Sequence, residues 1–182
     1  MQQHHAQALN PAFDQPVDGQ WTAAPSKTAS WVKRRVRFEQ IALGLIVALS
    51  LGLGLIRIGE EGYANAYYAA AVRSMLQDWR AFFFASYDAK GFVTVDKPPM
   101  GLWIQTASAW LFGYHGWSIL LHQILASTGS VLLIFAIIRK PFGAIAGLLA
   151  ALALAVAPVN VAVARNNSSD DVLAFFMLLG GV

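Results

Sequence analysis

Residues 33–58, KRRVRFEQIALGLIVALSLGLGLIRI, decide the fold class of this chain. A basic cluster stands directly before an apolar run that extends from about Phe38 to Ile58. A helix of about 20 apolar residues is long enough to cross the hydrocarbon core of a bilayer. Basic residues beside a first span favour the cytoplasmic side of the membrane. The stretch therefore predicts a signal-anchor helix over about 38–58, with the amino terminus in the cytoplasm.

The composition of the whole chain supports a membrane protein. Hydrophobic residues make up 57% of the 182 residues and charged residues only 13%, whereas an ordinary soluble domain carries about 25% charged residues. Cysteine is absent, which excludes disulfides, cysteine metal ligands and a cysteine nucleophile. Residues 1–37 are polar and lack periodicity, so we predict a disordered cytoplasmic tail there.

Three further apolar segments follow towards the carboxy end. We predict spans over about 117–138 and 144–164, separated by the basic pair Arg139-Lys140, and the start of a fourth span from 172. About a dozen residues after position 172 are too few to cross a bilayer. We therefore expect an all-α polytopic membrane protein and, in residues 38–182, the amino-terminal part of a longer transmembrane domain.

The segment between the first two spans, about 59–116, is predicted to be an outer loop of interfacial helices. Residues 62–79 are rich in alanine and carry a helical face of Asn65, Tyr68, Val72 and Leu76, each three or four residues apart. They also carry charges, which place the helix on the membrane surface rather than across it.

The motif VDKPPMGLW, residues 95–103, lies within this loop. Proline is excluded from helix interiors but suits the first helical turn, so we predict a turn at Asp96-Lys97 and a helix over 98–112. An ammonium group is suited to phosphate oxygens, and Lys97 is therefore a candidate ligand for a lipid phosphate. Asp96 has two readings, a functional carboxylate or the N-cap of the following helix.

Three motifs together resemble a known group of enzymes. They are NAYYAAAVRSM at 65–75, VDKPP at 95–99 with Trp103, and RNN at 165–167 with Asp170. The chain resembles, over about 38–182, the amino-terminal part of membrane glycosyltransferases related to lipid A aminoarabinose transferase and protein O-mannosyltransferases (the GT-C fold), and it is most similar to their bacterial mannosyltransferase-like branch. The Lys-Pro-Pro turn is the specific part of the resemblance.

The resemblance implies an enzyme that moves a sugar from a polyprenyl-phosphate carrier to a lipid, glycan or protein acceptor at the outer face of the cell membrane. It implies that Lys97 meets the carrier phosphate and that Asp170 is an acidic residue of the second outer loop. It also implies that Asp96 lies near the phosphate or a divalent metal. Arg165 and Asn166 are candidate substrate-binding residues beside Asp170, each with a plainer reading as the end of a span.

The resemblance departs from the family at the acid/base residue. An Asp-Glu pair precedes the helix tyrosine in better-known relatives, but Ala64 and Asn65 stand ahead of Tyr68 here. Either Glu61 serves as the base, or Asp96 does, or Asn65 only orients substrate. Asn65 and Tyr68 are also candidates for facing the sugar.

A transporter or channel component is the alternative function class. Such a protein would carry polar groups along the middle of its spans. The predicted spans between 117 and 164 hold few polar residues besides His122, Gln123 and Asn160, whereas the charged residues gather in the two predicted outer loops. This distribution favours the glycosyltransferase.

Overall fold

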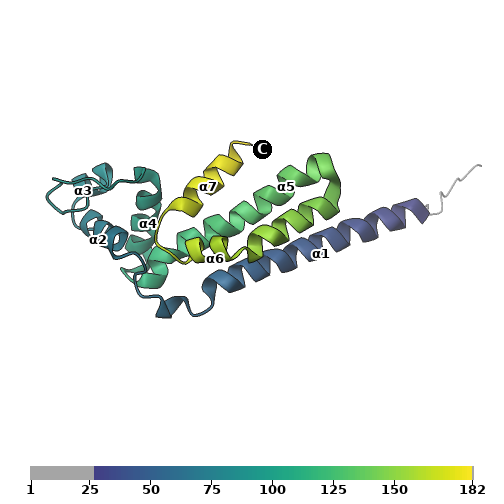
Figure 1. Cartoon of the computed structure of the whole chain (residues 1–182), viewed down its shortest axis with the longest axis horizontal. Coiled ribbons are helices and arrows are strands. Elements are labelled where there is room, and N and C mark those ends of the chain that lie inside the picture. The colour runs from purple at the N-terminus through teal and green to yellow at the C-terminus, as the bar shows by residue number, and fades with distance from the viewer. Residues whose placement is uncertain (1–26, 182) are drawn as a thin grey trace, which may run out of the picture.

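The computed structural model describes residues 27–181, with side chains described from residue 36 onward. The described residues form seven α-helices and one short 3₁₀ helix (Figure 1). Their bounds are α1 Lys27–Leu55, η2 Ile58–Glu60, α2 Ala66–Met75, α3 Trp79–Phe84, α4 Pro99–Phe112, α5 Gly116–Val156, α6 Pro158–Ala164 and α7 Asp170–Leu179. The only β-type pairing among the described residues is an isolated bridge between Ser86 and Thr94. The prediction of an all-α membrane protein is confirmed.

Two helical stretches are long and apolar enough to cross a membrane, Val36–Glu60 and Gly116–Val156. The second has 41 residues, and a straight helix of that length would extend for about 60 Å, twice the thickness of the hydrocarbon core. Gly143 breaks it with a φ of 83°, and the chain then folds back on itself (Figure 1). Residues 116–142 and 144–156 are thus two limbs of a hairpin, close to where the sequence predicts two separate spans.

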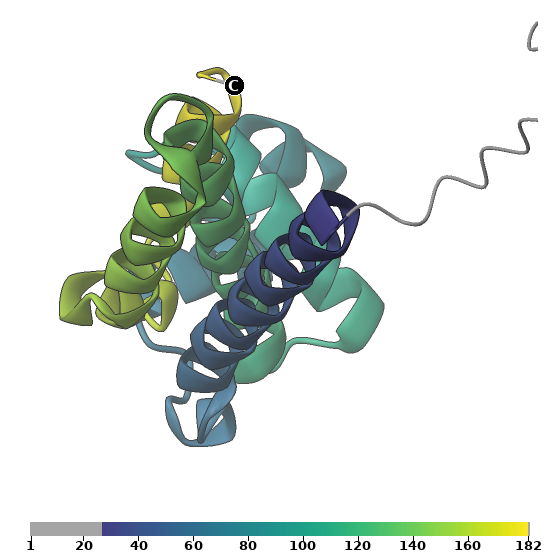
Figure 2. The same ribbon diagram turned by 90° about the vertical axis from the view of Figure 1, so that its right-hand side faces the viewer.

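Small residues allow the helices of this bundle to approach closely, as is common in membrane proteins. A Cβ atom on Gly54 of α1 would lie 2.6 Å from the Ile124 side chain of α5. A Cβ atom on Gly147, in the second limb of α5, would lie 3.0 Å from Phe135 in the first. Helix α1 therefore packs along α5 (Figure 2).

Several boundaries differ from the sequence prediction. Residues 1–26 of the predicted disordered tail lie outside the described residues, but 27–37 belong to α1, because Lys, Arg and Ala favour helix. The predicted span 144–164 is interrupted at Ala157, where Pro158 begins α6. A proline lacks the N–H that a continuous helix needs, so the chain restarts there with a new first turn.

Helices α2, α3 and α4 gather at the end of the bundle farthest from the start of α1 (Figure 1). They enclose a small core in which Tyr68 and Val72 of α2 pack with Leu102 of α4 and Ile119 of α5. The predicted surface helix 62–79 is shorter, at 66–75, and α3 follows as a separate helix that Asp78 caps. The helical face predicted for α2 is the face that packs inward.

The loop between α3 and α4 is held closed by Asp88. Its carboxylate accepts hydrogen bonds from the backbone N–H groups of Lys90, Phe92 and Val93, at 2.8–3.2 Å, and these bonds, that of Val93 foremost, lower the pKa of Asp88. The Val95 N–H then donates to the Ala85 carbonyl. The chain is thereby directed into the turn at 96–97.

Candidate functional site

Lys97, in the turn before α4, forms an ion pair with Asp170, the first residue of α7. The two residues lie 73 positions apart in the sequence. The Lys97 Nζ atom lies 2.9 Å from Asp170 Oδ1, and both side chains remain partly exposed, at 32% and 48%. The hydrogen bond that Lys97 donates to Asp170 is the main cause of a raised pKa for Lys97. The lysine is therefore firmly cationic and accessible at neutral pH.

Asp96 lies beside this pair and contacts α2. The Tyr68 hydroxyl donates a hydrogen bond of 3.4 Å to Asp96 Oδ1. Burial, followed by the charge of Asp96, raises the pKa of Tyr68, so the phenol stays protonated. The N-cap of α4 is Pro98, with no side-chain cap bond, and the alternative reading of Asp96 as the helix cap is therefore wrong.

A cleft of about 300 Å³ opens next to Lys97 and Asp170. Its lining combines these two charges with apolar side chains from the start of α4 and one face of α7, namely Pro98, Met100, Val172, Leu173 and Phe176. A charged end and an apolar wall suit an amphiphile with an anionic head. Gly101 and Ser169 also line the cleft. At these two residues α4 packs closely against the loop of residues 165–169, called the second loop below.

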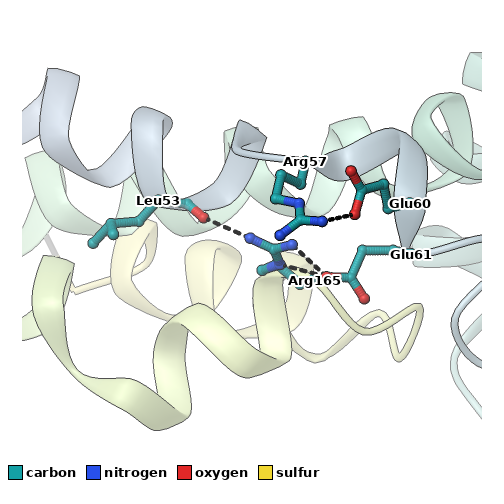
Figure 3. A network of polar contacts seen from close by, with 5 residues as sticks. All are labelled: Leu53, Arg57, Glu60, Glu61 and Arg165. Carbon is teal, nitrogen blue, oxygen red and sulfur yellow. Dashed lines mark hydrogen bonds and ion pairs between the residues drawn. The ribbon is translucent and has the colours of Figure 1, made fainter.

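Glu61 and Arg165 lie in a different network, at the end of α1 (Figure 3). Arg165 donates from Nε to Glu61 Oε1 at 2.9 Å and from a second guanidinium nitrogen to the same oxygen. Its third nitrogen donates to the Leu53 carbonyl at 3.1 Å, and Arg57 pairs with Glu60 nearby. Glu61 and Arg165 thus join the end of α1 to the start of the second loop.

Asn65 and Asn166 belong neither to the Lys97–Asp170 pair nor to the Glu61–Arg165 pair. The Asn65 side chain accepts a hydrogen bond from the Tyr67 N–H at 3.0 Å and so caps α2. Asn166 is exposed in the second loop. Of the eight predicted site residues, Tyr68, Asp96, Lys97 and Asp170 come together, while Glu61 and Arg165 pair with each other.

Two buried amides that the sequence reasoning did not assign to the site lie beneath it. Gln105 and Asn167 are both fully buried, and Gln105 Nε2 donates to Asn167 Oδ1. Gln105 attracts attention in the sequence only as a polar residue within an apolar helix. Nothing in its spacing identifies Asn167 as its partner, because the two residues lie 62 positions apart.

Asp171 is buried although its neighbour Asp170 is exposed. Its Oδ2 atom has no hydrogen-bond partner among the described residues. Burial, with a smaller effect of the Asp170 charge, raises the pKa of Asp171 to about 7. This carboxyl group, next to Asp170 in the chain, therefore keeps its proton more readily than an exposed aspartate does.

The described residues, 27–181, do not form a divalent-metal site by themselves. Among the described residues, no group of three or more His, Asp or Glu side chains gathers closely enough to hold a metal ion. Asp96 and Asp170 also flank the Lys97 ammonium, whose positive charge disfavours a second cation at that point.

Comparison with known proteins finds a matching family. Residues 96–180, which include Asp96, Lys97 and Asp170, match the family described as "Dolichyl-phosphate-mannose-protein mannosyltransferase". This part of the chain is similar to that mannosyltransferase family. Residues 61–68, with three of the other candidates, lie outside the matched range.

Two relatives from Bacillus subtilis (strain 168) extend the match. The chain is 47% identical over 148 residues to the protein named "Putative mannosyltransferase YkcB", a match that covers 81% of this chain. It is 48% identical over 144 residues to "Putative mannosyltransferase YycA", which covers 79% of this chain. The chain spans about a fifth (21%) of the length of each relative. No solved structure matches the chain.

Proposed function

We propose that this chain carries part of the active site of a membrane glycosyltransferase that takes its sugar from a polyprenyl-phosphate carrier. The ion pair of Lys97 with Asp170 at the mouth of an apolar cleft carries this proposal. A polyprenyl phosphate has an anionic head and a hydrocarbon tail, and the cleft offers a cation and an apolar wall at matching ends. The similarity of residues 96–180 to a mannosyltransferase family supports the same class of reaction.

In the proposed reaction, the bond between the sugar C1 and the carrier phosphate oxygen breaks, and its electron pair stays on the phosphate. The acceptor oxygen forms a new bond to C1 and releases its proton. The Lys97 ammonium stabilises the negative charge that develops on the leaving phosphate. The ammonium has three N–H donors, so Lys97 can keep its contact with Asp170 and donate its other N–H groups to the phosphate oxygens when the carrier binds.

Asp96 is the carboxylate that we assign as the proton acceptor. Asp170 is held by the Lys97 charge, whereas Asp96 is exposed and its carboxylate accepts a hydrogen bond from the neutral Tyr68 hydroxyl. Glu61 is engaged by Arg165, which favours a structural role for it. Tyr68 orients the Asp96 carboxylate from the side of α2.

The proposed site lies on the non-cytoplasmic side of the membrane. The amino-terminal basic cluster, residues 33–37, and the pair Arg139-Lys140 are predicted to be cytoplasmic by their charge. Helix α4, which follows the turn at 96–97, lies at the opposite end of the bundle from the bend within α5 and the start of α1 (Figure 1). A multi-pass protein with a cytoplasmic amino terminus would then present Lys97 to the carrier at the outer face.

Transfer from radiolabelled polyprenyl-phosphate sugars in membranes that contain the full-length protein tests the proposal. We expect Lys97→Ala to lower the transfer rate by about a hundredfold, the usual effect of removing one group that stabilises an oxyanion. Asp96→Asn should lower the rate while leaving carrier binding largely intact, because the amide cannot accept the proton. Transfer that is undiminished in both variants would contradict the site assignment.

Lys90→Ala is the matched control. Lys90 lies in the same loop and is exposed, but its side chain does not line the cleft. Its loss should leave the transfer rate within about twofold of the unaltered protein, as for most surface substitutions. An equal fall for Lys90→Ala and Lys97→Ala would show a general charge effect at the membrane surface instead of a specific phosphate contact.

The transporter alternative finds less support in the bundle. Two pairs of its internal polar residues hydrogen-bond to each other, Ser50 with Thr128 at 3.2 Å and Asn160 with Ser127 at 2.9 Å. The cavity beside them has a volume of about 10 Å³, which is room for about one water molecule. A substrate path needs far more space than this part of the chain provides.

A further inference from the structure

We propose that Asn167 and Gln105 are positioning residues that hold Asp170 against Lys97 and so set the geometry of the site. Among the described residues, the two amides hydrogen-bond to each other and to the carbonyls of Ile119 and Asn65, and not to Lys97, Asp96 or Asp170. They act through the backbone of the second loop. The consequence for catalysis rests on the proposed function, whereas the consequence for the position of Asp170 does not.

Asn167 joins three separate parts of the fold. Its Oδ1 atom accepts the hydrogen bond from Gln105 of α4, and its Nδ2 atom donates to the Asn65 carbonyl, at the N-cap of α2, over 3.4 Å. Gln105 Nε2 also lies 3.4 Å from the Ile119 carbonyl of α5. A single buried side chain of the second loop therefore contacts the N-cap of α2 directly and α5 through Gln105.

The environment of these amides makes their bonds costly to lose. Both residues are fully buried, and a buried amide that loses its partner is strongly destabilising because it stays removed from water with no replacement hydrogen bond. The Oε1 atom of Gln105 already has no hydrogen-bond partner among the described residues. Removal of Asn167 would leave the Gln105 amide with the Ile119 carbonyl alone.

The loop between Asn167 and Asp170 is short and tightly fitted. Only Ser168 and Ser169 intervene, and both are buried. Ser169 adopts a left-handed conformation with φ of 63°, which is unfavourable for a residue with a side chain and persists only where its surroundings impose it. With Asn167 anchored at one end, the Asp170 carboxylate has little freedom to leave the Lys97 ammonium.

A direct measure of position separates this role from catalysis. The chain has no cysteine, so Lys97→Cys and Asp170→Cys can be combined and joined by a short thiol-specific crosslinker in membranes. We expect Asn167→Ala to slow this crosslinking by about threefold or more, because the loop gains freedom once its buried anchor is lost. Crosslinking at an unchanged rate would overturn the proposal, whether or not the protein transfers sugar.

Kinetics of sugar transfer supply the second test. Asn167→Ala should lower kcat by about ten- to a hundredfold, as misplacement by about 1 Å does, and leave KM for the carrier nearly unchanged because Lys97 remains. In an Asp170→Asn background, Asn167→Ala should lower kcat by less than about twofold, because residues that act through one another are not additive. Effects that multiply in full would refute the positioning role.

Two controls keep these tests decisive. Ser50→Ala removes another buried side-chain hydrogen bond, the one with Thr128, and should change neither crosslinking nor kcat. If Asn167→Ala does not fold, the double variant Asn167→Leu with Gln105→Leu replaces both amides by apolar groups, which costs little stability. We expect that variant to accumulate and still to show slowed crosslinking, and normal crosslinking in it would overturn the proposal.

Discussion

Replacement of Gly101 by alanine should push the two loops of the site apart. Gly101 lies in the first turns of α4, and a Cβ atom there would lie 2.7 Å from Ser169 Cβ and 2.9 Å from Ser169 Oγ. Carbon atoms in contact are separated by about 3.5–4.0 Å. The second loop must therefore move by about 1 Å, and Asp170, the next residue, moves with it away from Lys97.

The size of the effect follows from this displacement. Overpacking of this kind costs about 1–3 kcal/mol, and the better helix propensity of alanine offsets about 1 kcal/mol of that cost. We therefore expect a loss of at most about 2 kcal/mol in the free energy of unfolding. A shift of about 1 Å at reacting groups lowers the rate by about a hundredfold, so the transfer rate should fall strongly in a protein that is still folded, because a domain is typically stable by about 5–15 kcal/mol.

The assay compares Gly101→Ala with Gly52→Ala in the same membranes. A Cβ atom on Gly52, in the interior of α1, would have no neighbour within 4 Å, so that variant should transfer sugar at the normal rate and unfold at the same temperature or slightly higher. The contrast between the two glycines isolates the contact with Ser169. If Gly101→Ala transferred sugar as fast as Gly52→Ala, the close approach of α4 and the second loop would be irrelevant to the site.

Two more predictions concern stability. Burial raises the pKa of Asp171 from 3.8 to about 7. Between these two pH values the folded protein keeps a proton that the unfolded protein loses. The free energy of unfolding should therefore fall by up to about 4 kcal/mol as pH rises from about 4 to about 7. Asp171→Asn should remove this loss, which thermal unfolding of both proteins in detergent at pH 5 and pH 8 would measure. If the unfolding temperature changed with pH by the same amount in both proteins, the carboxyl group would be ionised at both pH values and the reasoning would be wrong. Arg165→Lys should lower the free energy of unfolding by about 1 kcal/mol, because lysine cannot contact Glu61 and the Leu53 carbonyl with one planar fork, and should leave KM for the carrier unchanged. The exposed ion pair of Arg57 with Glu60 supplies the control, since Arg57→Lys should have almost no effect on the free energy of unfolding. A raised KM for the carrier in Arg165→Lys alone would instead indicate that Arg165 binds substrate.

Local patterns predict most of the secondary structure. Hydropathy and length identify the apolar helices, and prolines locate the start of α4 at Pro99, because these signals depend on residues next to each other in the chain. The split of α5 at Gly143 is also visible, since a basic pair and a proline precede it. Propensity and charge patterns are less informative about where α1 begins, because strongly basic segments can be either tails or helices.

The candidate site could be predicted only in part. Lys97 and Asp96 are evident from the Lys-Pro-Pro turn, and Asp170 from the resemblance to a family. Glu61 is equally plausible as a base in the sequence, but the structure pairs it with Arg165. Which charge meets which depends on the folding of segments about 100 residues apart, and no local pattern records it.

The amino-acid sequence alone determined that the chain is helical, that it belongs in a membrane and that an ammonium and a carboxylate stand at a Pro-Pro turn, since each of these follows from apolar content, helical period or the geometry of proline. Only the tertiary structure decided that Asp170 reaches Lys97, that Tyr68 supports Asp96 and that Asn167 is buried against Gln105. Those contacts arise where α2, α4 and α7 converge on one end of the bundle, and packing between distant segments, rather than any local preference, brings them together.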